Sequence, residues 1–346
     1  MKIIISAMSF MIQIFLCASA AIAEFKLVAV DNDTGEAIEN VLAHGIFRKC
    51  AQDWWKSAPA SNLDKKYTDK NGMVQLQGET DKGEVGYYLE KEGYYTAPKS
   101  EIMFEKGSLL GFGSWRPDNL CITSKMNKII HPIPLFVKNP CFDQWGKEEM
   151  NKRKLTNQVE RVSTLVASYD FIKGEWLPPY GCGLSTDVTI KAETELLGLD
   201  TSSRHFMNMR YKTTYTVIFP NAGDGIIEMP FDPTISLKIR TAQETGYDDK
   251  NTVTRWHQWL GVEKQHQTSF NKNRCFAFRI RTQRNSKGKI INGYYGKIYG
   301  DINFLEIDDS PFYYYLNLKP NDRNLEFDQK TNLYNGCEEL PKNLAP

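Results

Sequence analysis

The chain has 346 residues, of which 43 are basic and 42 acidic, so its formal net charge is +1. This balance excludes the strongly basic character typical of nucleic-acid-binding proteins and offers nothing to attract an anionic membrane, so no nucleic-acid partner is expected. The length suggests two domains.

The first residues predict an export signal. Lys2 precedes an apolar run from Ile3 to Leu16, and small residues lead to Ala21-Ile22-Ala23. A basic start, an apolar middle and an Ala-x-Ala end are typical of a secretory signal peptide, here residues 1–23, cleaved after Ala23. The alternatives are an uncleaved membrane anchor and, third, a lipoprotein modified at Cys17. No later apolar run is long enough to span a bilayer, so we expect a periplasmic or extracellular mature chain without a membrane span.

Residues 24–138 have the pattern of an antiparallel β-sandwich. Alternating runs at 25–30, 37–43, 67–76 and 86–95 are separated by turns rich in Asp, Asn and Gly. Asp31-Asn32-Asp33-Thr34-Gly35 offers three Asx oxygens, which also suggest calcium, but the Glu that closes an EF-hand loop is absent and we interpret it as a plain turn. Asn71-Gly72 is a hairpin signal. The run Lys128–Val137, with two prolines, predicts an edge strand that closes the sandwich.

This order of strands and turns resembles the carboxypeptidase regulatory-like (transthyretin-like) module. That module has a D-x-x-T-G-x-x-I/L turn before a Val strand, then T-D-x-x-G, an apolar strand and a strand ending near Gly-Tyr. The matching residues are Asp31 to Gly35, Ile38, Val41, Thr68, Asp69, Gly72, Val74, Gly93 and Tyr94. The resemblance covers about the first third of the chain and implies an Ig-like sandwich while saying almost nothing about function.

Two stretches depart from the module. An insertion between Gly45 and Lys66 carries Trp54 and Trp55, and an excursion after Tyr95 carries Trp115. Aromatic side chains on polar loops can stack on a sugar or a peptide, which makes these three tryptophans candidate binding residues. The alternative is that they pack their loops onto the domain.

Residues 139–167 are interpreted as a linker. Leu155, Val159, Val162 and Val166 recur at helical spacing and predict one amphipathic helix, with a partly ordered linker as the alternative.

Residues 168–346 predict a second β-rich domain. Strand patterns recur from Asp187 to Leu318, with one short helix at Val253–Leu260, and indicate a second sandwich or a jelly roll. Tyr294, Tyr295 and Tyr313 belong to a concentration of tyrosines in the last strands. They are candidates to line a carbohydrate groove, and half-buried strand tyrosines are the alternative.

The cysteine count indicates disulfides. Six cysteines remain after the signal, at positions Cys50, Cys121, Cys141, Cys182, Cys275 and Cys337. An even number in an exported chain favours bridges, whereas buried free thiols are the alternative. Six cysteines allow 15 connectivities, among which 50–121, 141–182 and 275–337 is our candidate set.

Motifs for catalysis are scarce, and we predict no catalytic residue, no metal and no cofactor. None of the five histidines begins a His-x-x-Glu, so the zinc peptidase that accompanies the regulatory module is not expected. His257, Glu263 and His266 lack the spacing of a helical zinc pair. Glu193 and Glu195 share one strand face, which we interpret as a solvated face.

The sequence therefore favours an exported, non-catalytic binding or scaffolding protein of the cell envelope, whose partner is an envelope protein or a glycan. Two alternatives remain open: a hydrolase using paired carboxylates in the second domain, and a structural assembly subunit.

Overall fold

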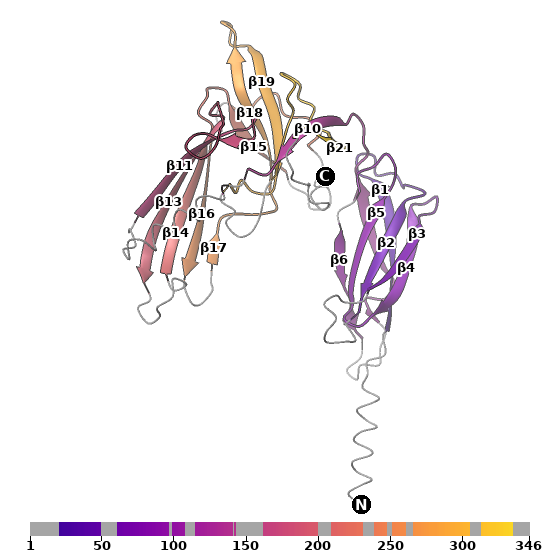
Figure 1. The fold of residues 1–346 in the computed structure, drawn as a ribbon. Helices are drawn as coiled ribbons and strands as arrows, with labels where there is room; N and C mark the ends of the chain where they lie inside the picture. The colour runs from indigo at the N-terminus through magenta and orange to yellow at the C-terminus, as the bar shows by residue number, and fades with distance from the viewer. Residues whose placement is uncertain are drawn as a thin grey trace, which may run out of the picture. The chain divides into compact units, whose positions relative to one another are not determined.

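The computed structural model describes residues 21–49, 61–96, 99–107, 115–140, 142, 162–199, 209–230, 239–247, 251–260, 266–304 and 313–334. These residues form strands, turns and loops without a helix, which confirms the predicted all-β fold (Figure 1). In this part of the chain no helix is therefore available to span a bilayer. Two compact units divide between Ile130 and His131, and each is described by itself.

Unit 1 is a sandwich of a three-stranded sheet, in the order β4-β1-β9, and a four-stranded sheet, in the order β3-β2-β5-β6. β1 runs antiparallel to β4 and parallel to β9. Phe25 and Leu76 from one sheet and Phe47 and Leu89 from the other are buried between them. The strands are β1 (Ala21–Asp31), β2 (Leu42–Arg48), β3 (Ser61–Tyr67), β4 (Met73–Thr80), β5 (Glu84–Glu90), β6 (Ser100–Met103), β7 (Glu105–Lys106), β8 (Trp115–Arg116) and β9 (Leu120–Met126).

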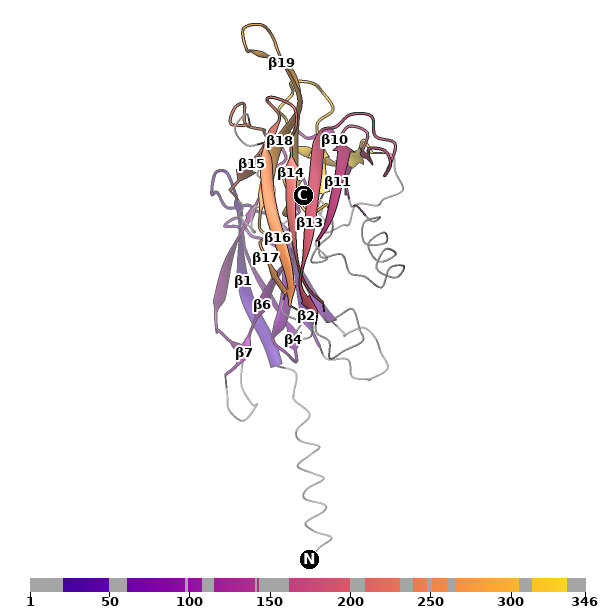
Figure 2. The same cartoon turned by 90° about the vertical axis from the view of Figure 1, so that its left-hand side faces the viewer.

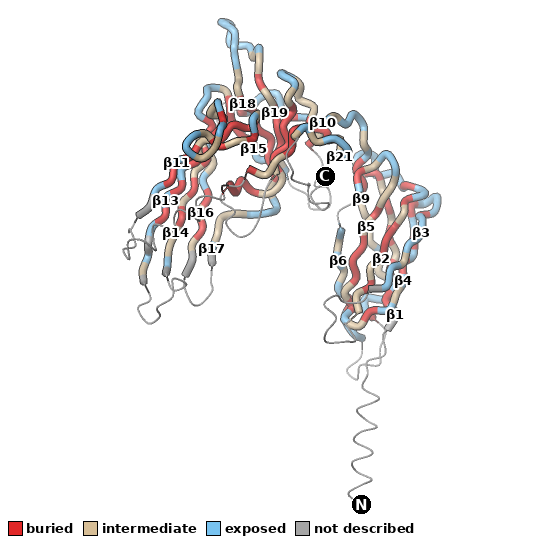
Figure 3. Tube along the Cα trace, in the orientation of Figure 1, coloured by how far each residue is buried: buried red, intermediate tan, exposed pale blue. Residues whose placement is uncertain are grey.

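Unit 2 contains two six-stranded sheets, in the orders β15-β18-β19-β20-β10-β21 and β12-β11-β13-β14-β16-β17. Figure 2 shows the second sheet face-on, and Figure 3 shows the buried residues along the strands of both sheets. The main core is aromatic: the rings of Phe171 and Phe278 stack at 4.9 Å, and Tyr314 meets Phe171 edge-on at 4.8 Å. The strands are β10 (Ile133–Lys138), β11 (Val162–Asp170), β12 (Glu175–Trp176), β13 (Val188–Leu199), β14 (Met209–Ile218), β15 (Gly225–Met229), β16 (Thr252–Leu260), β17 (His266–Thr268), β18 (Cys275–Arg284), β19 (Ile290–Tyr299), β20 (Tyr313–Leu316) and β21 (Phe327–Asn332).

The strand expected to close unit 1 lies in unit 2 instead. β10 pairs antiparallel with β20, with Phe136 opposite Leu316, and parallel with β21. It is therefore an interior strand, and the edge position predicted from its prolines is wrong. Pro134 is tolerated because the ladder to β21 is irregular between Ile133 and Leu135, where a backbone N–H is not required.

Two predicted helical stretches are strands. Val253–Leu260 lies in β16, which pairs with the whole of β14. Thr252, Val253 and Thr254 are β-branched, and this favours a strand over one short helix. Val162 and Val166 lie in β11 opposite β13, so the helix expected in the linker is wrong there. Leu155 and Val159 are outside the described residues.

The first strand overlaps the predicted signal peptide. β1 begins at Ala21, and Ala21 to Ala23 pair with Thr80 to Gly78 of β4. Ala23 is fully buried in the core of unit 1. The predicted cleavage after Ala23 stays a prediction, and it would remove the first three residues of this strand.

Candidate functional site

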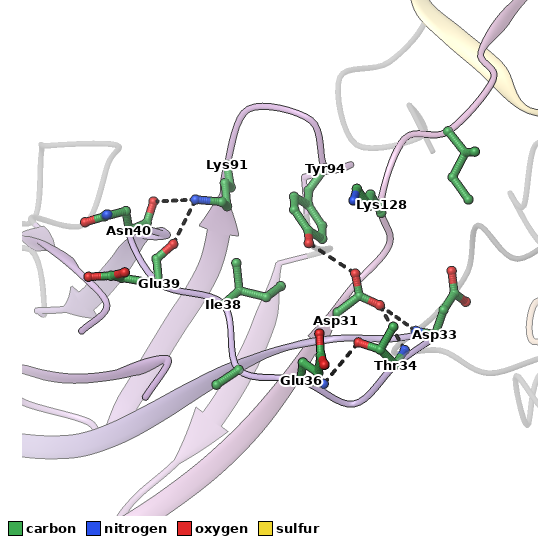
Figure 4. Close-up of a pocket in the computed structure, with 12 residues that line it drawn as sticks. Asp31, Asp33, Thr34, Glu36, Ile38, Glu39, Asn40, Lys91, Tyr94 and Lys128 are labelled. Carbon is green, nitrogen blue, oxygen red and sulfur yellow. Dashed lines mark hydrogen bonds between the residues drawn. The ribbon is translucent and has the colours of Figure 1, made fainter. Parts of the chain in front are cut away.

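Unit 1 carries a cavity of about 550 Å³ beside the turn that follows β1 (Figure 4). Its wall comes from the β1 turn, the segment leading to β2, the turn after β5 and the segment after β9. The lining residues are Asp31, Asp33, Thr34, Glu36, Ala37, Ile38, Glu39, Asn40, Lys91, Tyr94, Lys128 and Ile130. We call this cavity the unit 1 pocket.

Asp31 anchors one wall of the unit 1 pocket. Its Oδ1 accepts hydrogen bonds from the backbone N–H groups of Asp33 at 2.9 Å and Thr34 at 3.0 Å, and its Oδ2 accepts one from the Tyr94 hydroxyl at 3.1 Å. Burial acts to raise the pKa of Asp31, but these hydrogen bonds and the charge of Lys128 outweigh it, so the pKa lies below its usual value. The carboxylate closes an Asx turn, which is the plain turn predicted from the sequence.

The unit 1 pocket is acidic. Four carboxylates line it against two lysines, and Asp33, Glu36 and Glu39 are exposed. The Lys91 ammonium donates to the carbonyl oxygens of Glu39 at 2.8 Å and Asn40 at 3.4 Å, which fixes the segment before β2. The pocket thus combines a carboxylate rim with an apolar floor at Ile38, which is 6% exposed, and suits a cationic group on a short apolar stem.

The aromatic residues predicted to bind ligands are mostly built into cores. Trp115 is 5% exposed and packs in the core of unit 1, with the Lys106 ammonium 5.6 Å from its ring centre. Tyr295 is 4% exposed, and Tyr294 and Tyr313 are half-buried against clusters of unit 2. Trp54 and Trp55 lie outside the described residues. A binding role for these side chains stays a prediction.

The three described cysteines form no disulfide with one another. Cys121 and Cys182 are exposed, and Cys275 is buried. Each expected bridge has one member, Cys50, Cys141 or Cys337, outside the described residues, so the pairing stays a prediction.

The candidate metal ligands His257 and His266 lie on β16 and β17, and the candidate carboxylates lie on β13. His257 is buried on β16, and Glu263 lies outside the described residues. Within the described ranges no group of three or more His, Cys, Asp or Glu side chains is placed to hold a metal ion. Glu193 and Glu195 are exposed on β13, and Glu193 pairs with Lys191 at 2.9 Å.

A cluster that sequence reasoning missed joins the two sheets of unit 2. Arg281 of β18 donates to both oxygens of Asp187, at 2.7 and 3.0 Å, and to Oδ1 of Asp170 at 2.6 Å. Both aspartates are fully buried and belong to the other sheet or its border. Asp170 also accepts four backbone N–H groups, from Ile172, Lys173, Leu184 and Ser185. Its spacing from Arg281 along the chain leaves no local signal that could have found the pair.

A second buried pair joins the same two sheets elsewhere. The Arg255 Nε of β16 lies 2.9 Å from both carboxylate oxygens of Asp301, which follows β19. Asp301 also accepts from the backbone N–H groups of Asn271 and Ile302. We call the Arg281 and Arg255 pairs the inter-sheet clamps.

Comparison with known proteins names no family. No family model matches the chain, and no curated protein matches it. Among solved structures, 3-chlorocatechol 1,2-dioxygenase from Rhodococcus opacus is 16% identical, covers 33% of this chain and has a TM-score of 0.24. The chain spans 62% of that structure and 54% of an intradiol ring-cleavage dioxygenase from Tetranychus urticae.

Two major pilin subunits align over more of the chain. The major pilin of Corynebacterium diphtheriae is 11% identical, covering 85% of this chain and 77% of its own, with a TM-score of 0.24. A major pilin subunit of Bacillus cereus is 12% identical, covering 86% of this chain and 96% of its own, with a TM-score of 0.22. TM-scores this low carry no argument about function, and membership of the regulatory-like family stays a prediction.

Proposed function

We propose that the chain is an exported structural subunit that assembles with further copies of itself at the cell surface. The observation that carries this proposal is the pair of inter-sheet clamps in unit 2. Arg281 and Arg255 each hold a buried carboxylate of the opposite sheet by two short hydrogen bonds. Buried pairs add little net stability over apolar contacts, but they can fix one arrangement of the elements they join.

This geometry favours a mechanical role over chemistry. The buried carboxylates of Asp170, Asp187 and Asp301 accept hydrogen bonds from backbone N–H groups as well as from arginine, so the fold itself occupies them. Two sheets tied in this way resist sliding past each other, which is what a subunit under tension needs.

The test is sedimentation of the mature chain over a wide concentration range. A structural subunit is expected to form oligomers whose mass rises with concentration. A monomer at every concentration contradicts the proposal.

Binding of a glycan or an envelope protein is the second candidate, because the unit 1 pocket offers a place for it. A glycan array and a pull-down with the mature chain test it, and two empty results would remove it.

A further inference from the structure

One stretch of unit 2 breaks the overall charge balance. Residues 264–300 contain nine lysines and arginines and not one aspartate or glutamate. The fold accounts for four of these cations: Arg274 and Arg281 pair with carboxylates, Arg279 donates to backbone carbonyls, and Lys297 is buried. A second group of cations lies at the tip of the β18–β19 hairpin.

This tip, Gln283 to Lys289, projects as an arm beyond the sheet in both views (Figures 1 and 2). Each of its seven residues is exposed, including Arg284, Lys287 and Lys289 (Figure 3). The turn is well built: Asn285 Oδ1 accepts the N–H groups of Lys287 and Lys289 at 3.0 Å each. The arm therefore presents its lysines from a defined backbone.

The unit 1 pocket has the complementary charge. Asp33, Glu36 and Glu39 place exposed carboxylates around a cavity of about 550 Å³ (Figure 4). The side chain of lysine, an ammonium on an apolar stem, matches a carboxylate rim over the apolar floor at Ile38. The arm tip lacks the Trp, Phe or Leu that a membrane anchor would supply, which favours a protein surface as its partner.

We propose that the basic arm of one copy docks in the unit 1 pocket of a second copy. This inference rests on the proposed function and names the contact by which the subunits join. The two surfaces are different, so the contact is heterologous: each bound copy leaves one arm and one pocket open for the next copy. Because the contact is electrostatic and exposed, raising the salt concentration weakens it.

Charge reversal on the full mature chain tests this contact. The arm variant carries Lys287→Glu and Lys289→Glu, and the pocket variant carries Glu36→Lys and Glu39→Lys. None of these four side chains is tied into a core, because all four residues are exposed. The control, Lys272→Glu with Lys330→Glu, makes the same charge change as the arm variant at exposed sites of unit 2 outside the arm tip.

In sedimentation at low salt, the arm variant alone and the pocket variant alone are each expected to self-associate at least tenfold more weakly than the wild type. The reason is that like charges then face each other across the contact. An equal mixture of the two is expected to associate again, because each acidic partner meets a basic one. A single chain carrying all four changes is expected to regain self-association, and the control is expected to match the wild type.

Three results overturn the inference. If the wild type associates but neither variant changes it, the contact is elsewhere while the assembly function stands. If the mixture fails to regain association, or the control loses as much as the arm variant, the effect is general charge and not docking. If the wild type is monomeric throughout, both the contact and the proposed assembly fail.

Discussion

The Lys297 side chain is buried, so its ammonium group is shielded from water. It is 1% exposed, its Nζ lies 5.2 and 5.4 Å from the ring centres of Tyr299 and Tyr315, and it donates to the Ile239 carbonyl at 3.4 Å. Burial lowers its pKa from 10.5 to about 7, although the nearby charge of Glu326 acts to raise it. The folded chain therefore holds this amine largely neutral above pH 7, whereas the unfolded chain keeps it protonated.

The pH dependence of stability follows from that difference. Between pH 7 and 10.5 the unfolded state binds more protons at Lys297 than the folded state does. The free-energy cost of burying Lys297 in the folded protein therefore falls as the pH rises. Lys297→Met is expected to stabilise the protein by about 1–4 kcal/mol at pH 7. The gain is expected to shrink at pH 9.5. Urea unfolding of both proteins at the two pH values measures this, and an equal difference at both would contradict the low pKa.

Of the three described cysteines, Cys275 is expected to react most slowly with an alkylating reagent. Burial raises its pKa to about 11, with help from the charge of Glu228, so little reactive thiolate forms at neutral pH. In the reduced protein, iodoacetamide should label the exposed Cys121 and Cys182 first. Mapping the labelled peptides over time checks the order, and equal rates at all three thiols would refute it.

Among the elements, the hairpin turn before β4 depends on Gly72. Gly72 has a φ of 71°, and a Cβ there would lie 2.5 Å from the Ala29 carbonyl oxygen of β1. Gly72→Val is expected to cost about 1–3 kcal/mol from backbone strain alone. Thermal unfolding measures the loss. Gly35→Val is an informative comparison, since Gly35 has a φ of 74° but a Cβ there would meet no atom within 4 Å, so this variant isolates strain from the clash.

The Arg281 clamp is expected to contribute to the stability of unit 2, because it joins the two sheets. Asp187→Ala removes two acceptors of Arg281 and the acceptor of the Phe171 N–H. Losing one partner of a buried pair is expected to cost about 3–5 kcal/mol. Glu193→Ala is the control, because its pair with Lys191 is about half exposed and should change stability by less than about 1 kcal/mol. If Asp187→Ala lowers the stability no more than Glu193→Ala does, the Arg281 clamp does not stabilise unit 2.

Local signals in the sequence predicted the turns and the alternating pattern of the strands well. They predicted poorly which strands pair with each other. The Asp31 and Gly72 turns depend on residues within five positions of one another, so both turns can be recognised from the local sequence. The place of β10 depends on strands made almost two hundred residues later, as the hydrogen bond from the His131 N–H to Glu326 illustrates. The unit 1 pocket was missed because it joins four separate segments, of which only the Asp31 turn was visible as a motif.

At the scale of the whole molecule, the two units are expected to differ in their response to truncation. Every strand partner of β1 to β9 lies within unit 1, so a chain ending at Ile130 is expected to unfold cooperatively on its own. A chain ending at Phe304 loses β20 and β21 and leaves β10 without either neighbour. Circular dichroism melts of the two truncated chains should show one transition for unit 1 in both and none for unit 2 in the second. A unit 2 transition in the Phe304 chain would refute this dependence.

The interior position of β10 also sets an order of events during synthesis. A chain that emerges from its N-terminus can complete unit 1 once Lys128 has appeared, because Lys128 bridges back to Tyr94. The next strand to emerge, β10, must then stay unpaired until β20 (Tyr313–Leu316) arrives, and it gains its second neighbour only with β21 (Phe327–Asn332). Throughout that interval its apolar residues Leu135 and Val137, both buried in the finished fold, are open to wrong partners. A chaperone that shields unpaired strands would therefore matter for the second half of this protein far more than for the first.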